Sequence, residues 1–168
     1  MLTYVTLSRE SAGRIKELII TAGGENIPPV LIENEMKAAM LALSNCMVVG
    51  DRRKYLTMFI SVKTEVDKET GEPIDALAKD ALFVCAEIGS SATTVSDVMK
   101  DSKWTAYFNE GMKAANKKTT SNAQIVQKWS LLPVDFSEKA GDLTPTLKLK
   151  RNVVTKKLAG EIEALYAE

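Results

Sequence analysis

Two glycines followed closely by two prolines, Gly23-Gly24 and Pro28-Pro29, most constrain what this chain can fold into. The apolar residues 18–20 before the glycines are typical of a strand, and a glycine pair at that point favours a tight turn. Pro29 suits the first turn of a helix, because its missing N–H would have no partner there in any case. Apolar residues at helical spacing then run from Val30 to Leu43. The segment therefore predicts a strand, a turn and a helix in close succession.

The glycine pair has two interpretations. One is a turn that needs a positive φ angle, which glycine adopts without steric cost. The other is a backbone without side chains that lines a narrow tunnel for an extended ligand. Neither the GK[ST] nor the GxGxxG nucleotide fingerprint is present. Spacing alone favours the turn.

Composition restricts the chemistry that the chain can carry. Its 168 residues are enough for one domain with a core, and 22 basic residues balance 22 acidic ones, so we expect no nucleic-acid partner. The chain has no histidine, which excludes a Ser-His or Cys-His nucleophile–base pair and removes the commonest metal ligand; we expect no metal site. Cys46 and Cys85 are expected to be buried, reduced thiols.

The pattern along the chain predicts a small α+β domain with a helical insertion at about residues 63–118. Two strands, 46–49 and 55–62, are expected to form a hairpin around the polar residues 50–54. Ser102 is a candidate N-cap for a helix over 103–117. The remaining elements are a solvated loop at 67–73, a helix at 76–88, a strand at 125–132 and a last helix at 153–166.

Basic residues cluster near the C-terminus, in contrast to the even charge balance of the whole chain. They are Lys148, Lys150, Arg151, Lys156 and Lys157. Thr144-Pro145-Thr146 stiffens the approach to Lys148, and alternation with Leu147 and Leu149 would send Lys148 and Lys150 to one side of an extended segment. Spacing alone favours solvated side chains. The alternative is an ammonium group that neutralises a carboxylate and a phosphate oxygen together.

A second group of positive charges, Arg52-Arg53-Lys54, falls in the expected hairpin turn. The simpler interpretation is an exposed turn. The alternative is contact with a phosphate-bearing ligand or an anionic membrane surface. No apolar run approaches the roughly 20 residues needed to span a bilayer, and the N-terminus does not resemble a signal peptide, so we expect a cytoplasmic protein.

Two segments of the chain together resemble a known family. Residues 13–29, followed by Ile32-Glu33, look like the interdomain hinge motif of acyl-adenylate-forming enzymes. Residues 135–137 and 141–151 look like the C-terminal catalytic-lysine motif of the same family, and residues 89–96 like part of an insertion found in its bubblegum group of long-chain fatty-acyl-CoA synthetases. The resemblance implies the small C-terminal domain of that superfamily over residues 13–168, a short hairpin and a small mixed sheet flanked by helices, after an atypical lead-in at 1–12.

The resemblance implies a two-step ligase. ATP and a fatty acid give an acyl-adenylate and pyrophosphate, and the thiol of CoA then displaces AMP. Lys148 matches the lysine that bridges the fatty-acid carboxylate and the α-phosphate, and Arg14 matches an arginine that contacts the nucleotide. Lys16 lies at the hinge about which the small domain rotates between two poses, and Gly23 with Gly24 would line the pantetheine tunnel. Glu25 stands where some short-chain relatives carry an arginine for a CoA phosphate.

The family's large N-terminal domain, with its phosphate loop, Mg²⁺-associated glutamate and acyl tunnel, has no counterpart in this sequence. We therefore expect the C-terminal portion of an ATP-dependent long-chain fatty acid–CoA ligase, inactive alone, whose partners are fatty acid, ATP and CoA once it is joined to a large domain. Peripheral association with the endoplasmic reticulum membrane stays open. The alternatives are a non-catalytic docking or CoA-binding module, or a truncated gene fragment.

Overall fold

The computed structural model describes residues 17–167. Its centre is a three-stranded sheet with the order β3-β4-β7, formed by Leu43–Val49, Leu56–Val62 and Val126–Leu131. The expected hairpin of two strands is confirmed, since β3 pairs antiparallel with β4. Strand β7 lies parallel to β4 on its other side. A parallel neighbour needs a long crossover connection, and the segment between Val62 and Val126 provides it.

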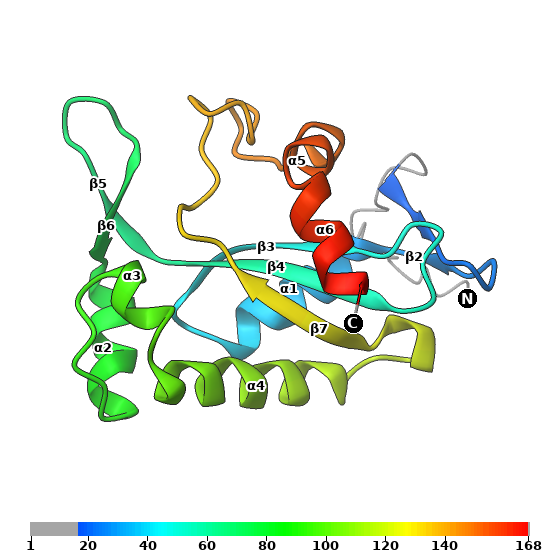
Figure 1. The fold of residues 1–168 in the computed structure, drawn as a ribbon, viewed down its shortest axis with the longest axis horizontal. Helices are drawn as coiled ribbons and strands as arrows, with labels where there is room; N and C mark the ends of the chain where they lie inside the picture. The colour runs from blue at the N-terminus through cyan, green and yellow to red at the C-terminus, as the bar shows by residue number, and fades with distance from the viewer. Residues whose placement is uncertain (1–16, 168) are drawn as a thin grey trace, which may run out of the picture.

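The sheet separates two hydrophobic clusters. Met58 and Ile60 belong to the larger cluster, whereas Phe59 between them belongs to the smaller one, as the alternation of side chains along a strand requires. Helices α1 (Pro29–Ala39) and α4 (Ser102–Asn116) lie on one side of the sheet, and α5 (Arg151–Lys157) and α6 (Ala159–Tyr166) on the other (Figure 1). All seven residues of β4 are buried, so this strand lies between the two clusters and contributes side chains to both.

The segment with the glycine and proline pairs folds largely as predicted. A short hairpin joins β1 (Ile19–Ile20) to β2 (Asn26–Ile27), and α1 begins at Pro29. The helix ends at Ala39, earlier than its apolar spacing suggests, because Met40 adopts an extended backbone and Leu43 starts β3. Met40 is nonetheless fully buried in the larger cluster.

The segment at about 63–118, expected as an insertion, departs from the predicted secondary structure at several points. The loop at 67–73 is the tip of a hairpin of β5 (Thr64–Val66) and β6 (Pro73–Leu77), so α2 (Lys79–Glu87) starts three residues later than expected. Between α2 and α4 lies the short α3 (Val95–Val98). Asp101 caps α4 through its carboxylate, which accepts from the N–H of Lys103, and Ser102 is the first residue of the helix.

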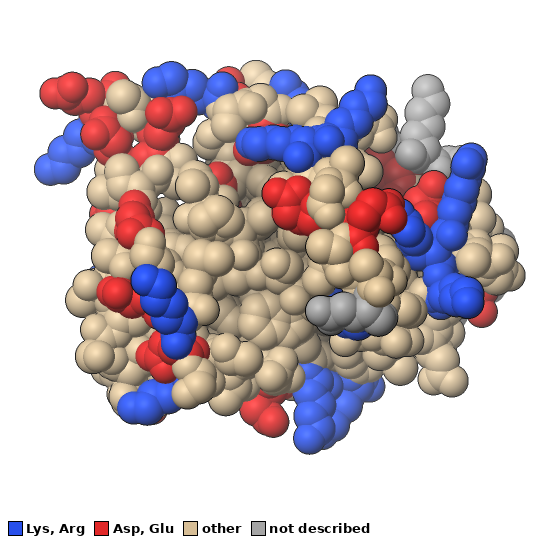
Figure 2. Space-filling model, viewed as in Figure 1, with Lys and Arg blue, Asp and Glu red and all other residues tan. Residues whose placement is uncertain are grey.

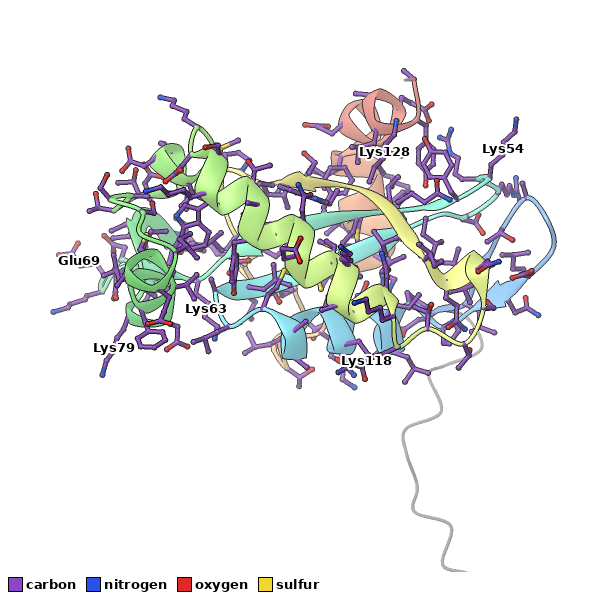
Figure 3. The ribbon with its side chains drawn as sticks, turned by 90° about the horizontal axis from the view of Figure 1, so that it is seen from below. Lys54, Lys63, Glu69, Lys79, Lys118 and Lys128 are labelled. Carbon is purple, nitrogen blue, oxygen red and sulfur yellow. The ribbon has the colours of Figure 1, made fainter. Side chains whose placement is uncertain are left out.

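Helix α4 joins the segment at about 63–118 to the hydrophobic core. Trp104, Phe108 and Met112 are buried on its inner face, and Figure 3 shows the helix running across the face of the sheet beside α1. A 3₁₀ turn, η2 (Asn122–Gln124), leads from this region into β7. The expected single helix at 153–166 is instead the pair α5 and α6, because Leu158 leaves helical geometry with φ −97° and ψ 18°. None of the helices within residues 17–167 is long and apolar enough to cross a membrane.

Candidate functional site

The glycine pair lies at the exposed tip of the β1–β2 hairpin, residues 19–27, called the Gly-Gly hairpin below. Thr21 closes the turn: its N–H donates to the Glu25 carbonyl at 3.1 Å, and its hydroxyl accepts from the Glu25 N–H at 3.2 Å. Gly24 has a φ angle of +81°, a conformation that favours glycine. The interpretation as a turn is confirmed. Gly23 and Gly24 are both exposed, so their backbone is accessible from outside the chain.

Backbone hydrogen bonds join the Gly-Gly hairpin to the turn between β3 and β4. The Ala22 N–H donates to the Arg53 carbonyl at 2.9 Å, and the Arg52 N–H donates to the Ile20 carbonyl at 2.7 Å. The expected position of the 52–54 charges in a hairpin turn is confirmed. Arg53 is not a free cation, because its guanidinium pairs with Glu163 and lies 4.7 Å from the ring centre of Tyr166. The hydrogen bond to Glu163 raises the pKa of Arg53, a partly exposed group.

Lys148 lies on a second hairpin, residues 142–150, called the lysine hairpin below. The Lys150 N–H donates to the Asp142 carbonyl at 2.8 Å at its base. Near its tip the Thr144 N–H donates to the Lys148 carbonyl at 2.8 Å, and the Thr144 hydroxyl accepts from the Lys148 N–H at 3.0 Å. These contacts fix the backbone of Lys148 while its side chain is exposed. Within residues 17–167 the Lys148 ammonium has no ion-pair partner.

The expected extended alternation around Lys148 is wrong at Leu147. This residue has a φ angle of +61°, so the chain turns there instead of running straight. Its side chain is 71% exposed, whereas Leu149 packs against the smaller hydrophobic cluster. Lys148 is therefore presented by a turn and not by a strand-like segment.

Two buried carboxylates hold the base of the lysine hairpin. Asp142 is 2% exposed, and its oxygens lie 2.9 and 3.2 Å from the Lys157 Nζ. Just beyond the hairpin, Arg151 Nη2 donates to Glu33 Oε2 at 2.5 Å, and Glu33 Oε1 accepts from the Val48 N–H at 2.8 Å. Sequence reasoning did not identify these pairs. The dense positive charge over 148–157 was the sequence signal that could have indicated buried ion pairs, since Arg151 and Lys157 neutralise buried carboxylates.

The Cys46 thiol lies next to Glu33 but is not a nucleophile. Its Sγ donates to the Glu33 carbonyl at 3.5 Å, and burial, with a contribution from the Glu33 charge, raises the pKa of the thiol to about 12. The predicted buried, reduced state of Cys46 and Cys85 is confirmed. The described part of the chain contains no group of three or more histidine, cysteine or acidic side chains that could hold a metal ion.

The structure does not bring the two hairpins together. The Gly-Gly hairpin lies at one end of the sheet, and the segment that leads into α5 lies above the sheet's face (Figure 1). Lysine, arginine and acidic side chains are spread around the edge of the face in Figure 2, with an uncharged area at its centre. Arg14 and Lys16, the expected nucleotide contact and hinge, lie outside the described residues.

A separate hollow lies among residues 17–167. It is an open groove of about 700 Å³ between α4 and β7, lined by residues that include Met112, Lys113 and Trp129. Neither Lys148 nor the glycine pair lines it. The candidate site residues that the structure describes thus lie on two exposed loops, outside this groove.

These loops and this fold define a class of protein. Residues 16–106 match the family model described as AMP-binding enzyme C-terminal domain, and the chain belongs to that family. The resemblance to acyl-adenylate-forming enzymes and the predicted α+β fold are therefore confirmed. The adenylation domain of a carboxylate reductase from Mycobacterium chelonae has a similar fold, with a TM-score of 0.64 at 18% identity over 92% of this chain and 20% of that one.

The more similar relatives are long-chain-fatty-acid–CoA ligases. ACSBG2 of Xenopus laevis is 50% identical over 158 residues, which is 93% of this chain and 21% of that protein. ACSBG1 of Homo sapiens is 42% identical over 158 residues, 93% of this chain and 22% of that protein. The chain thus spans about a fifth of the length of the curated relatives it matches.

Proposed function

We propose that this chain is the lysine-bearing lobe of a long-chain-fatty-acid–CoA ligase and acts together with a large domain. The observation that carries the proposal is the exposed ammonium of Lys148 on a hairpin with a fixed backbone, in a chain 50% identical to a ligase of that class. The large domain supplies the fatty acid and ATP sites, and alone the lobe does not turn over substrate.

Lys148 acts in the adenylation step. Its ammonium lies between the fatty-acid carboxylate and the α-phosphate of ATP and offsets the charge that develops on the phosphoryl oxygens. A compact ammonium on a flexible stem can approach both anions, and it need not act as a base. The fixed backbone supports this role, because a preorganised cation requires little reorganisation during the reaction.

The Gly-Gly hairpin acts in the thioester step, when CoA attacks the acyl-adenylate. Gly23 and Gly24 present backbone without side chains, which leaves room for the extended pantetheine of CoA. The separate locations of the two hairpins support their use in different poses, reached by rotation at Lys16, with Arg14 contacting the nucleotide. No ligand of Mg²⁺ is assigned to the described residues, which contain no group of three or more histidine, cysteine or acidic side chains that could hold a metal ion.

The test replaces the matching segment of Xenopus laevis ACSBG2 with this chain and measures palmitate-dependent ATP–pyrophosphate exchange. Lys148→Ala should lower the exchange rate by about 100-fold or more, the usual cost of losing one transition-state-stabilising group. Lys150→Ala is the matched control, because Lys150 is also exposed and lies two residues away. Equal exchange by Lys148→Ala and the parent chimaera would refute the proposal and favour a docking or CoA-binding module.

A further inference from the structure

Leu147 combines two unfavourable features at the residue directly before Lys148. Its backbone is left-handed, with a φ angle of +61°, and its leucine side chain is 71% exposed. Among residues 17–167 Arg52 is the other non-glycine residue with a positive φ, at 57°, and its charged side chain suits solvent. Of these two left-handed residues in the described chain, Leu147 is the one with an apolar side chain.

The lysine hairpin itself gains nothing from a leucine at this position. Its hydrogen bond here, from the Leu147 N–H to the Thr144 carbonyl at 2.8 Å, uses backbone atoms that glycine also has. A left-handed conformation disfavours a side chain with a Cβ atom, and strained residues of this kind concentrate at functional sites. Leu149, two residues on, shows the contrasting case of a leucine that packs against the core. The contact that would favour a leucine at position 147 therefore lies outside the described chain.

We propose that Leu147 is a positioning residue for Lys148 that packs against the hydrocarbon at the carboxyl end of the bound acyl chain. This inference rests on the proposed function. A fatty acid is charged at its carboxylate and apolar from the adjoining carbon onward, and consecutive Cα atoms lie about 3.8 Å apart. The Leu147 side chain leaves a Cα atom adjacent to that of Lys148, so it stays within reach of the hydrocarbon when the ammonium is at the carboxylate. The contact between Leu147 and the hydrocarbon holds the lysine hairpin where the Lys148 ammonium can reach the carboxylate.

Variants of Leu147 in the ACSBG2 chimaera test this role. Leu147→Gly and Leu147→Asn both suit a left-handed turn and remove the apolar side chain. Each should lower kcat/KM for palmitate in the exchange assay about tenfold, the scale of losing one buried apolar side chain. Leu147→Met keeps an apolar side chain of similar volume and should stay within about threefold of the parent. None should change the rate at which preformed palmitoyl-adenylate reacts with CoA.

The stability of the chain itself separates positioning from a structural role. Leu147→Gly relieves the strained turn, so its thermal unfolding midpoint should not fall below that of the parent chain. Arg52→Gly is the matched control, since it relieves a similar φ angle in a different turn. A lowered midpoint for Leu147→Gly alone, or equal losses in both half-reactions, would overturn the inference.

The outcomes for Lys148 and Leu147 are distinguishable. If Lys148→Ala abolishes exchange while Leu147→Gly matches the parent chimaera, this inference fails and the proposed function stands. If the parent chimaera is inactive or Lys148→Ala exchanges normally, the proposed function fails and the inference fails with it.

Discussion

The ion pair between Glu33 and Arg151 should stabilise the chain far more than its surface ion pairs do. The side chains are 9% and 18% exposed, respectively, and they join α1 to the start of α5, directly after the lysine hairpin. Arg151→Met removes the guanidinium but keeps an unbranched apolar stem. Glu33→Gln removes the charge and retains an oxygen that can accept from the Val48 N–H.

The expected magnitude follows from these contacts. Arg151→Met leaves Glu33 Oε2 without its 2.5 Å donor while the Val48 N–H still satisfies Oε1. Breaking a buried pair costs about 3–5 kcal/mol, and we take the lower end, about 3 kcal/mol, because one oxygen stays paired. Glu33→Gln leaves a nearly buried guanidinium uncompensated and should cost about 2 kcal/mol. The double variant should cost about 3 kcal/mol rather than the sum, a coupling of about 2 kcal/mol.

Urea unfolding followed by the fluorescence of Trp104 and Trp129 measures this double-mutant cycle. The control cycle uses Lys63 and Asp80, whose 2.8 Å pair is more exposed, with side chains 35% and 49% exposed. Its coupling should stay below about 1 kcal/mol. If the Glu33–Arg151 coupling is no larger than that of the control, burial does not strengthen this pair and the reasoning is refuted.

Two further predictions concern backbone strain and pH. Gly24→Ala should lower the free energy of unfolding by about 1 kcal/mol, because a φ angle of +81° disfavours a residue with a Cβ atom. The cost stays small because no atom lies within 4 Å of the new Cβ. A loss above about 3 kcal/mol in urea unfolding would contradict the turn geometry. Burial raises the pKa of Cys46 from 9.0 to about 12, so its contribution to stability is full below about pH 9 and is lost as pH rises toward 12. Unfolding measured across that range should show a shallower pH dependence in Cys46→Ala than in the parent, and equal slopes would contradict the burial argument.

The elements predicted correctly are those that local sequence determines. Glycine and proline restrict φ wherever they stand, so the Gly-Gly hairpin and the start of α1 at Pro29 followed from the sequence. The β5–β6 hairpin did not, because Thr64–Val66 and Pro73–Leu77 are short, contain a single buried residue and so lack an alternating apolar pattern. The break between α5 and α6 at Leu158 could not be predicted either, since that leucine is buried and its position fits the apolar stripe of a continuous helix.

The candidate site was predictable only in part for the same reason. The exposure of Lys148 agreed with its charge and its proline-containing approach. The turn at Leu147 ran against the preference of leucine, and no local rule predicts a left-handed leucine. The Glu33–Arg151 pair joins residues 118 positions apart, and such a partnership appears only when the fold places two helices together.

A strand buried along its whole length, β4, has a consequence for the order of catalysis under the proposed function. Because both hydrophobic clusters share this strand, a rotation of the lobe would carry its two hairpins together at a fixed separation. A rotation that moves the Lys148 ammonium relative to a large domain would therefore also displace Gly23 and Gly24. Adenylation and thioester formation would then be coupled by the fixed geometry of the lobe, with no signal passing between the two hairpins.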